Sequence, residues 1–200
     1  MWVNEKKMDT TNKSETHTFM SLDGYVQKEG DYTAWLPEGS QPIENGNGFH
    51  QFRESVSCAV MSGIYHATLQ ASDVWPFGDK MCYILTPRGF NLAPDVKADF
   101  IITDDNGYDY KKVVDQLRER TDGDIWLAGD QGIITRFMSQ GLIDEIILNI
   151  LPVTFGVGLP MFSNVKQIQD WTLQNHTIYS NGVVQLHYTA DRICGCLENG

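Results

Sequence analysis

The spacing of apolar residues predicts strands that alternate with helices over most of the chain. Apolar residues recur at helical spacing in four segments, which predicts helices at residues 47–56, 64–71, 110–117 and 133–138. Short apolar runs between polar or glycine-containing segments predict strands at residues 17–22, 57–61, 81–86, 98–103, 124–129 and 143–153. The last of these runs is apolar on nearly both faces, so we expect it inside a sheet that is covered on both sides.

The C-terminal part of the domain has a different pattern. Residues 171–190 alternate between apolar and polar positions on either side of Asn181-Gly182, the strongest short signal for a β-hairpin. A two-residue turn there places His176 directly opposite His187. Opposed histidines can share a metal ion, but the sequence offers no third ligand. We therefore expect ordinary solvent-facing or hydrogen-bonded histidines and no metal site.

Alternating strands and helices followed by an antiparallel hairpin are typical of a single α/β domain with a mixed, mainly parallel sheet. We expect a flexible leader at residues 1–16, the domain at 17–190 and a tail at 191–200. A chain of 200 residues with 42% hydrophobic residues can fill one substantial core.

Composition limits the classes of partner. The formal net charge of -11 argues against a broad nucleic-acid surface, and no run approaches the length of a membrane-spanning helix. Cys58 and Cys82 lie in apolar runs and are expected to be buried thiols, whereas Cys194 and Cys196 form too short a motif for a zinc site. We expect a cytoplasmic protein.

The segment WLAGDQGIITRF, residues 126–137, has the order of a strand, a glycine turn and a helix start. The free N–H groups of such a helix start can bind a phosphate. Alternatively, Asp130 only caps the helix, and its negative charge disfavours a phosphate. The segment by itself favours the cap, and it is not a GxGxxG dinucleotide motif.

Four other residues have a functional and a plain interpretation. Asp23 can bind a polar substrate or only form a turn with Gly24, and Trp35 can stack on a planar ligand or anchor its own loop. Thr86 and Arg88 follow a strand end and suit a phosphate monoester, although an exposed arginine is commonplace.

In this order the motifs resemble dihydrofolate-reductase-like proteins related to the C-terminal reductase domain of the bifunctional riboflavin-biosynthesis deaminase-reductase. The resemblance covers residues 17–190 and is most specific in residues 125–162, where GLIDE at 141–145, Pro152-Val153 and GVGLPMF at 156–162 match the family pattern. MSLDGYV at 20–26 matches the first-strand motif of the family. Trp35 stands where the family usually has a tryptophan after this motif.

The resemblance implies a three-layer α/β/α dihydrofolate-reductase-like fold, a homodimer and an NADPH-dependent reductase. Its substrate would be a small pterin- or pyrimidine-like heterocycle, as for a 5-amino-6-(5-phosphoribosylamino)uracil reductase. Asp23 would be the catalytic acid, and Asp23 and Trp35 would bind the substrate. The cofactor would contact Ser62, Gly63, Thr86, Arg88, Gly129, Asp130, Gln131, Gly132 and Ile133.

Two departures from the family pattern fall on the cofactor side. Ser62, Gly63 and Tyr65 stand where the family has a glycine, an arginine and a threonine, and Asp130 replaces the second glycine of a pair. Loss of the arginine removes a charged hydrogen bond worth roughly 1.5–3 kcal/mol. The rival hypothesis is therefore a non-catalytic protein of the same fold that acts as a binding or interaction module.

Overall fold

The computed structural model describes residues 12–28, 48–71, 75–92, 96–103, 109–129, 131–163, 165 and 168–191. The predicted Trp35 and Asp130 sites and the cysteines of the tail lie outside these residues. The large central sheet consists of β1 (Ser14–Ser21), β3 (Val56–Ser62), β4 (Met81–Thr86), β5 (Ala98–Ile102), β6 (Asp124–Leu127), β7 (Glu145–Leu151), β9 (Trp171–Ile178) and β10 (Val184–Ala190). The helices are α1 (Phe49–Ser55), α2 (Gly63–Ala71), α3 (Tyr110–Arg120) and α4 (Gln131–Met138).

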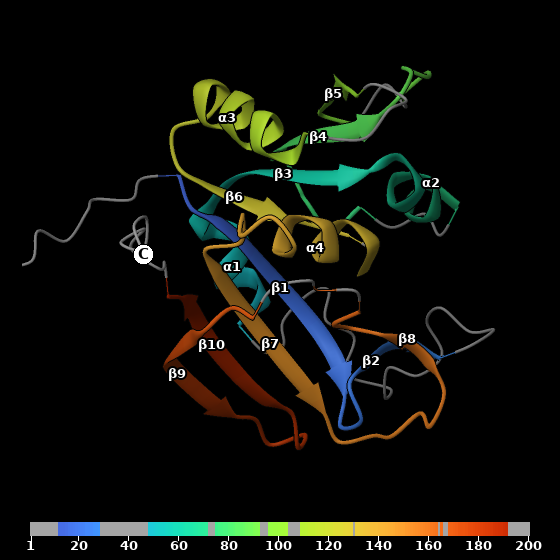
Figure 1. The fold of residues 1–200 in the computed structure, drawn as a ribbon. Coiled ribbons are helices and arrows are strands. Elements are labelled where there is room, and N and C mark those ends of the chain that lie inside the picture. Colours follow the sequence, from blue (N-terminus) through green and yellow to red (C-terminus); the bar gives the residue numbers. More distant parts are fainter. Residues whose placement is uncertain are drawn as a thin grey trace, which may run out of the picture.

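The eight strands lie in the order β5-β4-β3-β6-β1-β7-β10-β9 (Figure 1). The six strands from β5 to β7 in this order are parallel to one another, whereas β10 is antiparallel to both β7 and β9. Parallel neighbours present their carboxyl ends at one edge of the sheet. The prediction of a mixed, mainly parallel sheet with a terminal antiparallel hairpin is confirmed.

Two helices cover each face of the sheet. The buried residues of α3 and α4, among them Leu117 and Phe137, pack with Val60 and Leu127 on one face. Phe49 and Phe52 of α1 and Leu69 of α2 pack with Trp126 and other strand residues on the opposite face. The fold therefore has the predicted three layers, with a separate apolar core on each side of the sheet (Figure 1).

The end of α4 shows how the sequence sets a helix boundary. Gly141 has a φ of +64°, and its N–H donates to Met138 O while Leu142 N–H donates to Phe137 O. These two bonds satisfy the last carbonyls of the helix, and the left-handed conformation favours glycine. The helix predicted at residues 133–138 therefore ends at Met138, as expected.

Three local features differ from the sequence-based predictions. β1 begins at Ser14, within the predicted leader, because Ser14 N–H donates to Asp144 Oδ2 and Ser14 pairs with Ile125. Two short strands, β2 (Tyr25–Lys28) and β8 (Gly158–Pro160), form a small second sheet that the pattern did not indicate. Strands of three and four residues are too short to show a periodic pattern.

The prediction that His176 opposes His187 is wrong. Tyr179 N–H donates to Val183 O, so three residues rather than two form the turn, with Gly182 at a φ of +86°. His187 therefore pairs with Asn175 and His176 with Leu186, which points the two imidazoles to opposite faces of the sheet. A turn of three residues that ends with a glycine of positive φ is a common hairpin alternative to the two-residue turn.

Candidate functional site

The carboxyl ends of three neighbouring strands bring together residues that are far apart in the sequence. β4, β3 and β6 are adjacent and parallel, with Ser62 paired to Leu85 and Val60 paired to Leu127. The predicted cofactor residues follow these three strands: Ser62 and Gly63 at β3, Thr86 and Arg88 at β4, and the turn at Gly129 after β6. In Figure 1 this edge carries the starts of α2 and α4.

Gly63 fits closely against the next strand. A Cβ built on Gly63 would lie 3.7 Å from both Cβ and Oγ1 of Thr86. Ser62 Oγ accepts a hydrogen bond from Tyr65 N–H at 3.1 Å, which caps the start of α2. The backbone at the start of α2 therefore lies directly beside the end of β4.

Thr86 and Arg88 form a tight turn after β4. The buried Thr86 hydroxyl donates to Arg88 O at 2.7 Å, and Arg88 N–H approaches the same hydroxyl at 3.4 Å. Arg88 itself is exposed, and within the described parts of the chain no carboxylate forms an ion pair with its guanidinium. This turn thus presents an exposed cation beside the end of β4, of a kind that binds anionic groups.

A second polar group lies at the same strand ends. Thr103 N–H donates to Thr86 O at 3.0 Å, yet the buried Thr103 hydroxyl has no hydrogen-bond partner among the described residues. Buried hydroxyls normally have a partner, because an unpaired one costs about 1–3 kcal/mol. An orphaned hydroxyl next to Thr86 fits a site that takes a polar ligand.

Gly129 has a conformation that other residues rarely adopt. Its φ is +140°, and a Cβ there would lie 3.4 Å from the Tyr65 ring and 3.4 Å from Ile133 Cγ2. The Tyr65 ring therefore lies against the turn between β6 and α4. The starts of α2 and α4 meet at this point, and their first N–H groups lack partners within the helix.

The side chains at the start of α4 bond and pack within the protein. The Gln131 amide donates to Thr135 Oγ1 at 2.6 Å and also to Ser163 Oγ, and Ile133 belongs to the buried core. Gln131, Gly132 and Ile133 can therefore offer a cofactor only their backbone. This agrees with an anion site made of helix N–H groups and not with one made of side chains.

Asp23 is occupied by contacts to a distant loop. Its carboxylate accepts hydrogen bonds from Ser21 Oγ at 2.6 Å, from Gly156 N–H at 2.7 Å and from Phe155 N–H at 3.1 Å. Mainly the Ser21 hydroxyl, followed by the Gly156 N–H, lowers the pKa of Asp23 to about 2. A carboxyl that is ionised at neutral pH has no proton to give, so Asp23 holds a loop and does not fit the predicted role of catalytic acid.

The amino ends of β1 and β7 carry a buried charge cluster that the sequence did not reveal. Glu145 accepts from Lys13 Nζ at 2.6 Å and lies 2.7 Å from His187 Nε2, and mainly the His187 contact lowers the pKa of Glu145. Glu15 pairs with Glu145 across the strands, and burial followed by the Glu145 charge raises the pKa of Glu15 to about 8. This cluster lies at the edge opposite the cofactor residues.

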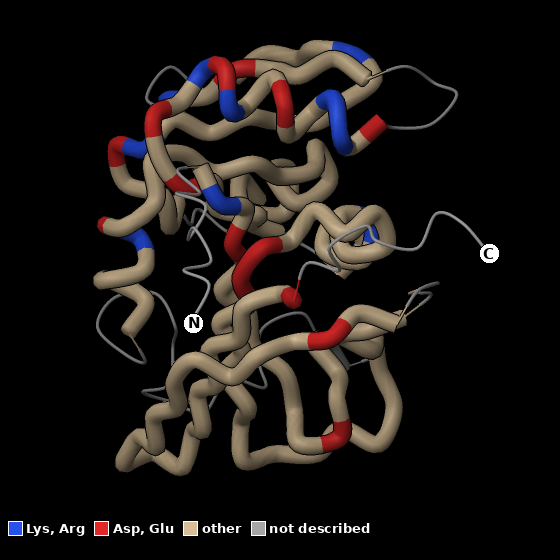
Figure 2. Tube along the Cα trace, turned by 60° about the vertical axis from the view of Figure 1, so that its left-hand side comes forward, with Lys and Arg blue, Asp and Glu red and all other residues tan. Residues whose placement is uncertain are grey.

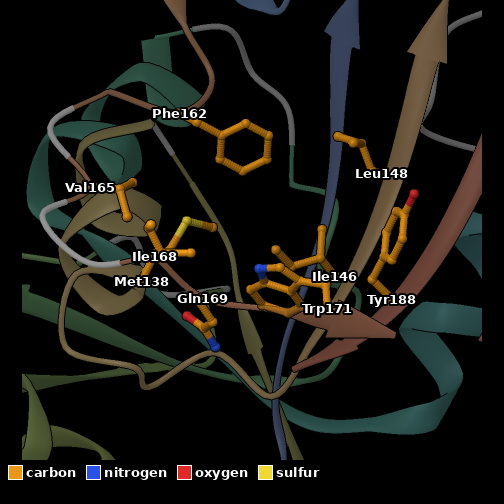
Figure 3. Close-up of a pocket in the computed structure, with 9 residues that line it drawn as sticks. All are labelled: Met138, Ile146, Leu148, Phe162, Val165, Ile168, Gln169, Trp171 and Tyr188. Atoms are coloured by element: carbon orange, nitrogen blue, oxygen red, sulfur yellow. The ribbon is translucent and has the colours of Figure 1, made fainter. Parts of the chain in front are cut away.

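The structure also contains an apolar pocket of about 490 Å³ beside α4 (Figure 3). It is lined by Met138, Ile146, Leu148, Phe162, Val165, Ile168, Gln169, Trp171 and Tyr188. The pocket lies over β7 and β10 and is distinct from the strand ends that carry Thr86 and Gly129. The sequence showed Ile146, Leu148 and Tyr188 as alternate residues of two strands, but not that they line one pocket with Met138 of α4.

The described residues offer neither a metal site nor a membrane-spanning helix. They contain no cluster of three or more His, Cys, Asp or Glu side chains that could hold a metal ion. None of their helices is both long enough and apolar enough to span a membrane. Cys58 and Cys82 are free and buried as predicted, and burial raises the pKa of these thiols to about 11 and about 12.

Comparison with known proteins identifies relatives across nearly the whole domain. The model of the RibD C-terminal domain family matches residues 15–185. Uncharacterized protein YwjB of Bacillus subtilis (strain 168) is 29% identical over 177 residues, which are 88% of this chain and 97% of YwjB.

Two solved structures share the fold at lower identity. A putative riboflavin biosynthesis protein from Shewanella sp. PV-4 has a TM-score of 0.76 at 20% identity and covers 90% of this chain and 99% of its own. Dihydrofolate reductase from Enterococcus faecalis, solved with NADP(H), has a TM-score of 0.59 at 13% identity and covers 90% and 96%. The predicted dihydrofolate-reductase-like fold is therefore confirmed.

Proposed function

The chain belongs to the RibD C-terminal domain family, and from this premise we propose that it is an NADPH-dependent reductase of a small heterocyclic substrate. The observation that carries the proposal is the meeting of Gly63, Thr86, Arg88 and Gly129 at one edge of the sheet. We further propose a pterin- or pyrimidine-like substrate of the riboflavin-biosynthesis type, as in a 5-amino-6-(5-phosphoribosylamino)uracil reductase. The riboflavin-related description of the Shewanella structure supports this choice.

The residues at the strand ends fit a phosphate-bearing dinucleotide. The first N–H groups of α2 and α4 would bind the two central phosphates, since these groups lack partners within their helices. Arg88 and the Thr103 hydroxyl would bind the additional phosphate on the adenosine ribose. When bound, NADPH supplies a hydride to the substrate.

The residues of the protein would contribute to the reaction mainly by positioning the cofactor and the substrate. The turn at Gly129 and the Tyr65 ring that lies against it would limit how far the cofactor enters the site. The loop at Phe155 and Gly156, held by Asp23, would lie beside the end of β1. Because Asp23 is ionised, the proton of the reduction has to come from another group or from solvent.

We expect NADPH to stabilise the protein against heat more than NADH does, because only NADPH carries the phosphate assigned to Arg88. Arg88→Ala should weaken NADPH binding about 10- to 100-fold, as expected for one charged hydrogen bond, and leave NADH binding unchanged. Titration followed by tryptophan fluorescence measures both affinities. Arg120→Ala is the matched control, since Arg120 faces Asp99 on the surface near α3.

The same titration separates the proposal from its rival. If neither nucleotide binds or stabilises the protein at millimolar concentration, the chain is a non-catalytic member that uses the fold as a binding module. The features that favour this rival are the departures from the family pattern at Ser62, Gly63, Tyr65 and Asp130.

We also propose that the protein is a homodimer that buries the pocket of Figure 3. Phe162, Ile168 and Leu173 beside the pocket are exposed by 47%, 92% and 46%, and large contiguous apolar patches mark interaction sites. Among the described residues from 137 to 191, Figure 2 shows acidic positions but no Lys or Arg, and none of the residues that line the pocket is charged. Like charges therefore oppose pairing of two copies only weakly.

We expect light scattering to give a dimer mass for the native protein and a shift towards monomer for Ile168→Glu, with a dissociation constant at least about tenfold higher. Ile168 is almost fully exposed, so the substitution should not disturb folding. Ile64→Glu, on the opposite face of the sheet, is the matched control because Ile64 is 78% exposed. A monomer mass for the native protein would contradict the proposal.

We propose the cytoplasm as the place of action, in keeping with two free buried thiols.

A further inference from the structure

A buried histidine without polar partners lies one turn into α2. His66 is fully buried, and neither of its ring nitrogens has a hydrogen-bond partner among the described residues. Its neighbours are aromatic, with the Trp75 ring at 6.1 Å and the Phe90 ring at 5.3 Å between centroids. Burial lowers the pKa of His66, so the imidazole is neutral and acts as one more flat ring in this cluster.

Phe90 is the outer member of the cluster. Its ring packs against His66 and, at 4.9 Å and an angle of 69°, against Phe100 of β5. Gly89 also lies close to Phe100, since a Cβ there would be 3.5 Å from the ring. Phe90 nevertheless remains 40% exposed. Two neighbouring rings therefore support the Phe90 ring, and part of it is open to solvent.

The exposed Phe90 ring lies close in the chain to Arg88, which relates it to the proposed cofactor site. Phe90 follows Arg88 by two residues, so their Cα atoms lie within about 7 Å of each other. In the proposed function Arg88 binds the phosphate of the adenosine ribose, and the purine is bonded to that same ribose. A purine stacks on an exposed aromatic ring, which contributes about 1–3 kcal/mol per base in nucleic-acid complexes, or roughly 5- to 150-fold in affinity.

We infer that the exposed part of the Phe90 ring, which packs on His66 and Phe100, receives the adenine of the cofactor. The inference rests on the proposed function and deepens it, because it assigns a residue that determines affinity for the adenosine half. Phe90 also offsets part of the binding lost with the arginine that is absent at Gly63. Contact of the purine with Phe90 would cover the remaining exposed apolar surface of the cluster.

The experiment uses adenosine 2′,5′-bisphosphate and reduced nicotinamide mononucleotide, the two halves of the cofactor, as separate probes in calorimetric titrations. Phe90→Ala should weaken binding of the adenosine probe by roughly 5- to 150-fold and leave the nicotinamide probe unchanged. Phe90→Tyr keeps the ring and should retain the native affinity within about threefold. Ile178→Ala, which removes an apolar side chain that is 73% exposed on the distant hairpin, is the control.

A third variant gives a direct readout that a structural role would not produce. In Phe90→Trp, the adenosine probe should quench fluorescence beyond the effect seen with the native protein, because the base then stacks on the introduced indole. If the native protein binds the adenosine probe but Phe90→Ala binds it equally well, the inference is overturned and the proposed function stands. If the native protein binds neither the probe nor NADPH, both are overturned.

Discussion

Glu15→Gln should stabilise the protein by on the order of 3 kcal/mol at pH 8, an unusually large gain for one substitution. Glu15 is 7% exposed and lies in β1 between Glu145 of β7 and Trp126 of β6. Burial, the Glu145 charge and the Asp124 charge raise the pKa of Glu15 from 4.5 to about 8. A glutamine keeps the shape and an N–H donor for Asp124 but carries no charge.

The direction of the pH dependence follows from the raised pKa. Between about pH 4.5 and pH 8 the unfolded chain releases the Glu15 proton while the folded protein retains it. The contribution of Glu15 to stability is therefore fully present below pH 4.5 and is lost as the pH rises to about 8. At about 1.36 kcal/mol per pH unit this interval corresponds to roughly 5 kcal/mol. We expect less because the second amide hydrogen of glutamine also needs a partner.

Urea unfolding at several pH values measures this effect. The native protein should lose stability from pH 5 to pH 8 relative to Glu15→Gln, and the two should converge near pH 4.5. Glu119→Gln is the matched control, since Glu119 lies exposed on α3 and should leave the difference unchanged. Equal stability of native protein and Glu15→Gln at pH 8 would show that Glu15 is ionised in the folded state without cost.

Gly129→Ala should reduce NADPH binding by more than tenfold and lower the free energy of unfolding by about 1–3 kcal/mol. At a φ of +140° a side chain strains the backbone, and the new Cβ would press on the Tyr65 ring and on Ile133. To relieve the contact with Tyr65 or Ile133, the start of α2 or of α4 has to move. These two helix starts are the elements that would bind the cofactor phosphates. The two losses therefore arise from one displacement.

Gly141→Ala separates backbone strain from damage to the site. Gly141 also has a positive φ, at the other end of α4, but a Cβ there meets nothing within 4 Å. We expect a loss of about 1 kcal/mol in stability and native affinity for NADPH. Isothermal titration together with urea unfolding distinguishes the two variants. Native cofactor affinity in Gly129→Ala would mean that the turn after β6 does not touch the ligand.

Local features of the fold were predictable because their causes lie within a few residues. The apolar stripe of residues 110–117 specifies the buried face of α3. The positive φ of Gly141 specifies the end of α4. The hairpin around Gly182 was equally visible. Its register was not predictable, because turns of two and of three residues are both compatible with the same Asn-Gly pair. The hydrogen bond from Tyr179 N–H to Val183 O selects the longer turn.

The candidate site was predictable in part, and chiefly through the order of its motifs. Thr86, Arg88 and Gly129 each follow a strand, which the sequence shows, but nothing local states that β4, β3 and β6 are neighbours. The role of Asp23 was not predictable from its surroundings in the chain. Two of the N–H groups that occupy its carboxylate come from residues more than 130 positions away.

The sequence by itself determined the strands and helices, the α/β class and the family, because periodicity, glycine turns and motif order act over short stretches of chain. Only the tertiary structure decided which residues share an environment. It placed Glu15 beside Glu145, His66 beneath Phe90, and Tyr65 against Gly129. Charge, solvent exposure and hydrogen bonding depend on neighbours in space, so the pKa values and the binding surfaces appear only once the sheet has been assembled.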